Sequence, residues 1–113
     1  MRVFTTYQVA TIVTNHGFKK IRPLKTQDGE YRYQIKGLTD DEWKIYEHDL
    51  CHDEPLSDQE IEDLIEPGGW MILDGFTAGG VKRLYEALGD TAREKFDSVP
   101  IGRIAAFMFV RCT

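Results

Sequence analysis

Side chains suited to metal binding crowd together at one place in the sequence, at His48, Cys51 and His52. Residues three and four apart share a face of a helix, so a helix here would stack His48 over both Cys51 and His52. Imidazole and thiolate are good zinc ligands, and tetrahedral zinc takes four ligands, or three and a water. One hypothesis is therefore a zinc site, or a small hydrolase, centred on these residues and completed by Asp53 or Cys112.

Two features of the sequence oppose that hypothesis. Zinc ligands usually come in pairs from separate elements, and the chain has no second pair of histidine and cysteine. The helix that would align the cluster is expected to end near Leu50, which would spoil its spacing. A nucleophilic role for Cys51 or Cys112 needs a thiolate, which the surrounding carboxylates disfavour. We therefore predict no catalytic residue and no cofactor, and keep zinc as an alternative.

The strongest charge feature is the stretch from Asp40 to Glu66, which holds twelve carboxylates and one lysine, a net charge of −11. Carboxylates spaced along a rigid helix can imitate the charge of a DNA backbone and enter a cationic groove on a nucleic-acid-processing protein. The alternative is a solvated acidic face. The residues predicted to bind a basic partner are Asp40, Asp41, Glu47, Asp58, Glu62, Asp63 and Glu66.

The first third of the chain has the opposite charge, because residues 1–39 carry seven cations and two carboxylates. Cations interleaved with Tyr31 and Tyr33 on a β-ribbon suit phosphate contact and base stacking. Alternatively, the tyrosines pack inward and the cations face water. The net charge of −5 opposes general nucleic-acid affinity. The nucleic-acid-binding residues in this alternative are Lys19, Lys20, Arg22, Arg32 and Lys36.

Local signals predict the elements of the first half of the chain. A capping box from Thr5 to Gln8 predicts a helix over 6–15, although its β-branched residues leave a strand open. Runs 18–25 and 30–36, separated by a turn that ends in Asp-Gly, predict a hairpin. Pro23 predicts that the first of these runs is an edge strand.

Later signals predict a short strand and several helices. Thr39 and Ser57 are expected to cap two acidic helices, and the run 70–73 is expected to be a buried strand. Thr77 is expected to cap the next helix. A short helix over 91–98 and an apolar last element follow, with 104–112 left open as helix or strand. The predicted fold is a single α+β domain over 1–113, with an N-terminal helix, a β-hairpin in a small antiparallel sheet, and a mainly helical C-terminal two-thirds.

The bulk composition limits the class of protein. A length of 113 residues predicts one domain, and 42% hydrophobic residues predict a folded chain. No apolar run approaches the roughly 20 residues that span a bilayer, and the first residues lack signal-peptide features. We expect a cytoplasmic protein of a bacterial or host cell, with no membrane partner. The apolar last element suggests a possible homodimer.

The segment 81–110, VKRLYEALGDTAREKFDSVPIGRIAAFMFV, resembles segments of small uncharacterised proteins from phages and prophages. The resemblance implies an inhibitor or adaptor of host machinery, as anti-restriction and anti-CRISPR proteins are, and it assigns no site residues. Together with the charge pattern it leads to the main hypothesis, a small acidic non-enzymatic binding protein that engages a basic surface of a nucleic-acid-processing partner.

Overall fold

The computed structural model describes residues 2–48, 50, 56–65 and 68–112, with side chains as far as residue 107. These residues form helices and a three-stranded antiparallel sheet of order β2-β1-β3, which confirms the predicted α+β fold. In chain order the elements are α1 (Thr6–His16), β1 (Lys19–Lys25), β2 (Tyr31–Ile35), α2 (Asp40–Glu47), α3 (Asp58–Glu62), β3 (Met71–Leu73), α4 (Gly75–Ala87), α5 (Asp90–Phe96) and α6 (Ile101–Cys112).

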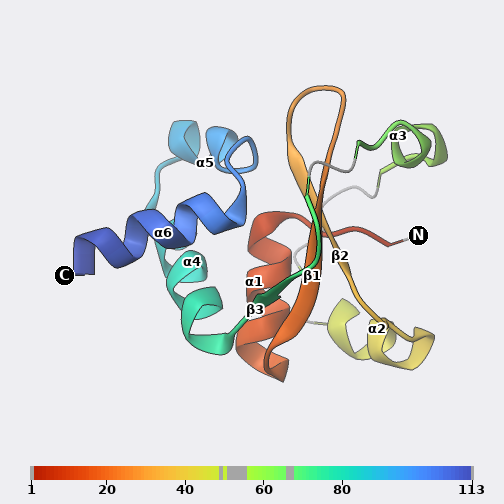
Figure 1. Cartoon of the computed structure of the whole chain (residues 1–113), viewed down its shortest axis with the longest axis horizontal. Coiled ribbons are helices and arrows are strands. Elements are labelled where there is room, and N and C mark those ends of the chain that lie inside the picture. The colour runs from red at the N-terminus through yellow and green to blue at the C-terminus, as the bar shows by residue number, and fades with distance from the viewer. Residues whose placement is uncertain (1, 49, 51–55, 66–67, 113) are drawn as a thin grey trace.

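One helical layer packs on the core side of the sheet, and two short helices lie on the other side of the strands (Figure 1). Helices α1, α4, α5 and α6 lie on the left of the strands, and α2 and α3 lie on the right. The main core forms between the first group and the sheet, where Val9, Ile21, Leu73, Val81 and Ile104 are all buried. None of the helices in the described part of the chain is long and apolar enough to cross a membrane.

Helix α1 begins where the sequence predicts. The Thr5 hydroxyl accepts a hydrogen bond from the Gln8 backbone N–H, and the Gln8 side chain accepts one from the Thr5 backbone N–H. Its β-branched residues favour a strand locally, but Ile12 and Val13 are fully buried in the core as parts of a helix. Burial of an apolar face outweighs the small difference in local propensity.

The hairpin joins the sheet to the last helix. Gly29 at its turn has a φ of 87°, the left-handed region that glycine adopts without strain. Tyr33 and Ile35 of β2 alternate toward the core. The buried Tyr33 hydroxyl oxygen accepts a hydrogen bond of 2.7 Å from the Ile101 backbone N–H, which fixes the start of α6 against the sheet.

The prediction that Pro23 lies in an edge strand is wrong, because β1 is the central strand. Proline has no backbone N–H, and at position 23 that N–H would point to the β3 side of β1. Pro23 is tolerated because β3 pairs only with residues 19–21, so no strand needs a hydrogen bond from position 23. Gly68 passes this point closely, and a β-carbon on it would lie 3.1 Å from the Pro23 ring.

The prediction that Thr77 caps the fourth helix is also wrong. Asp74 is the N-cap of α4, and its side chain accepts a 2.7 Å hydrogen bond from the Thr77 backbone N–H. The helix therefore starts three residues early, and its first turn contains Gly75 and the exposed Phe76. The bond from Thr77 holds the pKa of the Asp74 carboxyl below its ordinary value.

We expect Asp74→Ala to lower the melting temperature at neutral pH. Because the folded pKa is depressed, the contribution of Asp74 is present above the unfolded pKa and is lost as pH falls through the folded pKa. The difference from the wild type should therefore shrink in acid. Asp74→Asn, which keeps a good capping acceptor, should retain most of the stability without that pH dependence. Thermal denaturation of the three proteins across the acid range checks this.

Candidate functional site

The sheet carries a mixed cationic and apolar surface on the side that faces away from the core. Residues alternate along a strand, so the even-numbered positions of β1 and β2 point opposite to Ile21 and Tyr33. The β1–β3 register places Ile72 opposite Lys20 on that side. We call this surface the outer sheet face and define it as Lys20, Arg22, Gln34, Lys36, Trp70 and Ile72.

Trp70 occupies the middle of the outer sheet face. The Arg22 guanidinium lies 5.0 Å and the Lys36 ammonium 5.7 Å from the centre of its ring, which is within cation–π range. Arg22 also donates a 2.8 Å hydrogen bond to the Gln34 side chain. The tryptophan is thus held by cations from two strands while 40% of its surface stays exposed.

The outer sheet face is closed at one end and open at the other. Near the hairpin tip Leu24 is buried, although it points away from the core containing Ile21. At the other end Ile72 is 60% exposed. Because Lys19 pairs with Leu73, the exposed Phe18 and Phe76 lie near this open end, one before β1 and one in the first turn of α4.

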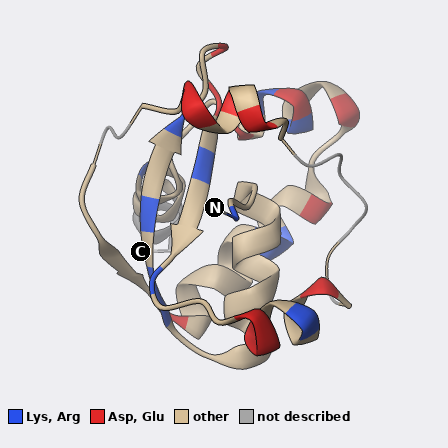
Figure 2. Ribbon diagram, turned by 90° about the vertical axis from the view of Figure 1, so that its right-hand side faces the viewer, with Lys and Arg blue, Asp and Glu red and all other residues tan. Residues whose placement is uncertain are grey.

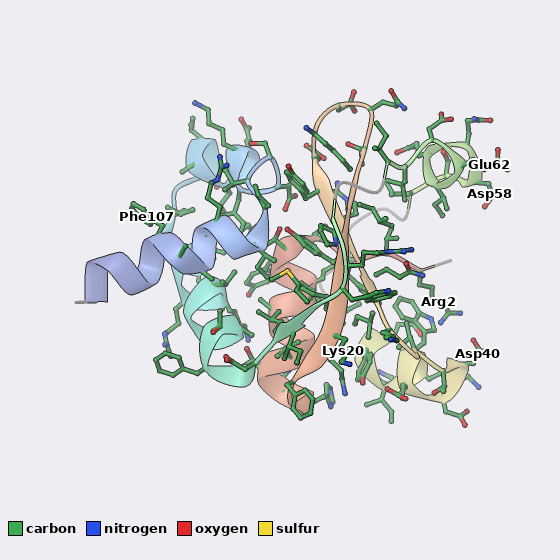
Figure 3. All side chains as sticks on the ribbon, in the orientation of Figure 1. Arg2, Lys20, Asp40, Asp58, Glu62 and Phe107 are labelled. Carbon is green, nitrogen blue, oxygen red and sulfur yellow. The ribbon has the colours of Figure 1, made fainter. Side chains whose placement is uncertain are left out.

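The predicted acidic residues fall into two groups rather than one surface. Helix α3 lies near the hairpin tip, where Ile65 pairs with Lys25, whereas α2 follows the opposite end of β2. Figure 2 shows the acidic residues of α3 and α2 above and below the strands, and Figure 3 shows Asp58 and Glu62 far from Asp40. The described acidic residues therefore form two groups, one near each end of the strands.

Within each group the predicted carboxylates are accessible. Asp58, Glu62 and Asp63 are exposed on or next to α3, and Asp40, Asp41 and Glu47 are exposed on α2. Glu66 lies outside the described residues.

Helix α2 rests on the body through two aromatic residues. Trp43 packs 5.7 Å from the ring of Phe4 and lies under the Arg2 guanidinium at 4.3 Å. Tyr46 is buried beside His16, and its hydroxyl donates a 2.9 Å hydrogen bond to Glu42. Burial raises the pKa of Tyr46 above its ordinary value. These contacts fix the acidic side of α2 toward solvent.

The five cations of the predicted nucleic-acid site do not all lie on one face of the sheet. Arg32 contacts Glu30 at 2.8 Å and Asp97 at 3.8 Å, and Lys19 lies over the Tyr46 ring on the inner side of the sheet. Lys20, Arg22 and Lys36 remain on the outer sheet face. Tyr33 is buried and Tyr31 is packed against the core, so neither offers a free ring to a base.

The predicted metal cluster is only partly described. Helix α2 ends at Glu47 rather than near Leu50, and His48 is its exposed C-cap. The predicted cluster also includes Cys51 and His52. Those two residues, and Asp53, lie outside the described part of the chain, as does the side chain of Cys112. Among the described residues there is no group of three potential ligands, and zinc stays an untested alternative.

A cavity of about 620 Å³ beside the N-terminal segment is lined in part by charged and polar side chains that form hydrogen bonds. Arg93 donates to the backbone carbonyls of Tyr85 and Glu86, and the Tyr7 hydroxyl donates to the Glu86 side chain. These bonds stabilise the junction of α1, α4 and α5. The cavity is therefore less suited than the outer sheet face to meet a partner.

Sequence reasoning missed the two exposed apolar residues of the outer sheet face. Trp70 and Ile72 lie in a short apolar run that predicts a buried strand, and the strand is present, but only Leu73 of β3 is buried. Comparisons with protein-family models, with curated proteins and with solved structures find no match for this chain.

Proposed function

We propose that this chain is a non-enzymatic protein-binding protein whose contact surface is the outer sheet face. The acidic helices α2 and α3 flank that surface and attract a partner that carries basic groups around its contact site. The role is that of an inhibitor or adaptor, as the resemblance to phage proteins implies, acting in the cytoplasm of a bacterial or host cell on a nucleic-acid-processing protein.

The observation that carries this proposal is the exposure of large apolar side chains on an otherwise charged face. Trp70 is 40% and Ile72 60% exposed at adjacent positions of one strand face, next to Lys20. Tryptophan and arginine are enriched among the residues that dominate protein–protein binding energy. A central apolar group with a charged rim is the usual composition of a specific interface.

The charge layout supports a protein partner over nucleic acid. A nucleic acid laid along the outer sheet face would meet the carboxylates of α3 at one end and of α2 at the other. Among the proposed phosphate ligands, Arg32 is already paired with Glu30. A protein with an acidic or neutral centre and a basic rim would complement both parts of the surface, and such complementarity mainly raises association rate and specificity.

A homodimer through the apolar last element is a second arrangement suggested by the sequence. Phe107 of helix α6 is 51% exposed. Arg103 is exposed on the same helix. Pairing α6 with its copy would bring cationic side chains together, so this arrangement is less favourable than binding to a different protein.

We expect charge reversal on α3 to slow association with the partner. The partner is first recovered by affinity capture with the wild-type chain from its native host cell. The double variant Asp58→Lys and Glu62→Lys should lower the association rate constant by about tenfold at low salt, and the difference should fade as salt increases. Surface plasmon resonance at several ionic strengths measures both.

Helix α5 offers a matched control. Asp90 and Glu94 are exposed, are spaced as Asp58 and Glu62 are, and lie in the helical layer on the core side of the sheet. Asp90→Lys with Glu94→Lys changes the net charge equally, and we expect it to slow association much less. Equal slowing by both pairs would show that only total charge matters.

The nucleic-acid alternative has its own test. It would be favoured if the wild type bound single-stranded oligonucleotide tightly and in a salt-sensitive way, and if Lys20→Glu with Lys36→Glu abolished that binding.

A further inference from the structure

A second apolar surface lies on the helical side of the molecule, away from the outer sheet face. Helices α4, α5 and α6 enclose a groove of about 330 Å³. Its floor is made by Phe96 and Ile104, which are 5% and 6% exposed, and Leu84 lines it from α4. Phe107 of α6, labelled in Figure 3, also lines the groove and remains 51% exposed. We call this groove between α4, α5 and α6 the helical groove.

Two charged residues line the helical groove, and both are cations. Lys95 belongs to α5 and Arg103 to α6, and both are exposed. The ion pairs found among the described residues all involve Arg32, so neither rim cation has an acidic partner in that part of the chain. The helical groove therefore combines an apolar floor with a positive rim on a protein whose net charge is −5.

We propose that the helical groove binds an amphipathic helix of a partner protein, with apolar side chains on one face and carboxylates beside them. Apolar side chains spaced by three and four residues on a helix can enter a groove between helices. The volume suits a few such side chains, since it lies at the small end of the range for binding pockets. Carboxylates on the flanks of that helix would meet Lys95 and Arg103.

The rim charge also decides against a second copy of this chain as the occupant. Two copies that packed their helical grooves together would place Lys95 and Arg103 next to the same cations of the other copy. Like charges placed together at an interface are unfavourable, whereas carboxylates from a different protein would be favourable. The helical groove is separate from the outer sheet face, and binding of a helix there does not require that face.

The test uses two labelled synthetic peptides of about 16 residues, long enough to form helix. Both carry leucine at positions i, i+3, i+4 and i+7, and one has glutamate and the other lysine at the flanking positions. We expect the glutamate peptide to bind the full-length chain at least tenfold more tightly in fluorescence anisotropy. In nuclear magnetic resonance spectra, its backbone shift changes should concentrate in α4, α5 and α6.

Two variants keep the result interpretable. Lys95→Glu with Arg103→Glu should make the lysine peptide bind more tightly than the glutamate peptide, because the apolar lining of the groove is unchanged. Phe107→Ala should lower the affinity for both peptides. Circular dichroism confirms that each variant is folded. Equal affinity for both peptides, shift changes outside the three helices, or no saturable binding up to about 1 mM would overturn the proposal. Concentration-dependent dimerisation that Phe107→Ala abolishes would also overturn it, in favour of self-association.

Discussion

Replacing Tyr33 with alanine should lower the free energy of unfolding by about 3–5 kcal/mol, the range for removing a large aromatic side chain from a core. Tyr33 is fully buried, and its hydroxyl is the acceptor for the Ile101 backbone N–H. Tyr33→Phe isolates the hydroxyl. It should cost about 1–3 kcal/mol, because the buried N–H is left without its partner. Urea unfolding followed by circular dichroism measures both values.

Tyr31 provides the control for that prediction. It belongs to the same strand and is only partly buried, so Tyr31→Ala should cost clearly less than Tyr33→Ala. Similar losses at the two positions would contradict the central place of Tyr33 in the fold.

The pH dependence of Tyr33 follows from the same burial. Burial raises the pKa of Tyr33 to about 12 from an ordinary value of 10.0. The folded state therefore holds the phenol proton more tightly than the unfolded state does. The stability that this provides is fully present below the unfolded pKa and is lost as pH rises toward the folded pKa. The stability gap between the wild type and Tyr33→Phe should therefore narrow in strong alkali.

Trp70→Ala should weaken binding to the captured partner by about 2–4 kcal/mol, roughly 30- to 1,000-fold. The ring is the largest exposed apolar group on the outer sheet face, and Arg22 and Lys36 hold it in place. Its removal takes away the contact itself and the group that orients two neighbouring cations. We expect most of the loss in the dissociation rate, because contacts at the centre of an interface mainly affect that rate.

Trp43→Phe is the control for the tryptophan prediction. Trp43 packs under Arg2 on α2, away from the outer sheet face, so its replacement should leave binding within about twofold. Unfolding curves of both variants separate loss of contact from loss of fold. A Trp70→Ala protein that is folded and binds the partner as tightly as the wild type would place the interface elsewhere.

The parts of the fold that the sequence predicts correctly depend on short-range chemistry. The Thr5 and Gln8 capping box and the turn at Gly29 are formed by residues within one turn of each other. Ser57 and Thr39 cap their helices for the same reason. Such signals do not depend on contacts with distant parts of the chain.

The errors arise where distant segments meet. Pro23 lies in the central strand because β3 returns to pair with the other end of β1, which local propensity does not reveal. Asp74 rather than Thr77 caps α4, because both are good capping residues and the end of β3 decides where the helix starts. The candidate site also depends on contacts between distant segments, because the pairing of Lys20 with Ile72 brings Trp70 to the hairpin cations.

The most direct test of the outer sheet face is photo-crosslinking in the native host cell. A photoreactive phenylalanine analogue is placed at Ile72 in one variant and at Ile45 in another. The two isoleucines have similar exposure, 60% and 54%, but Ile72 lies on the outer sheet face and Ile45 on α2. We predict a specific protein adduct from position 72 and little or none from position 45. An adduct from position 45 alone, or a nucleic-acid adduct from position 72, would contradict the proposed protein-binding surface.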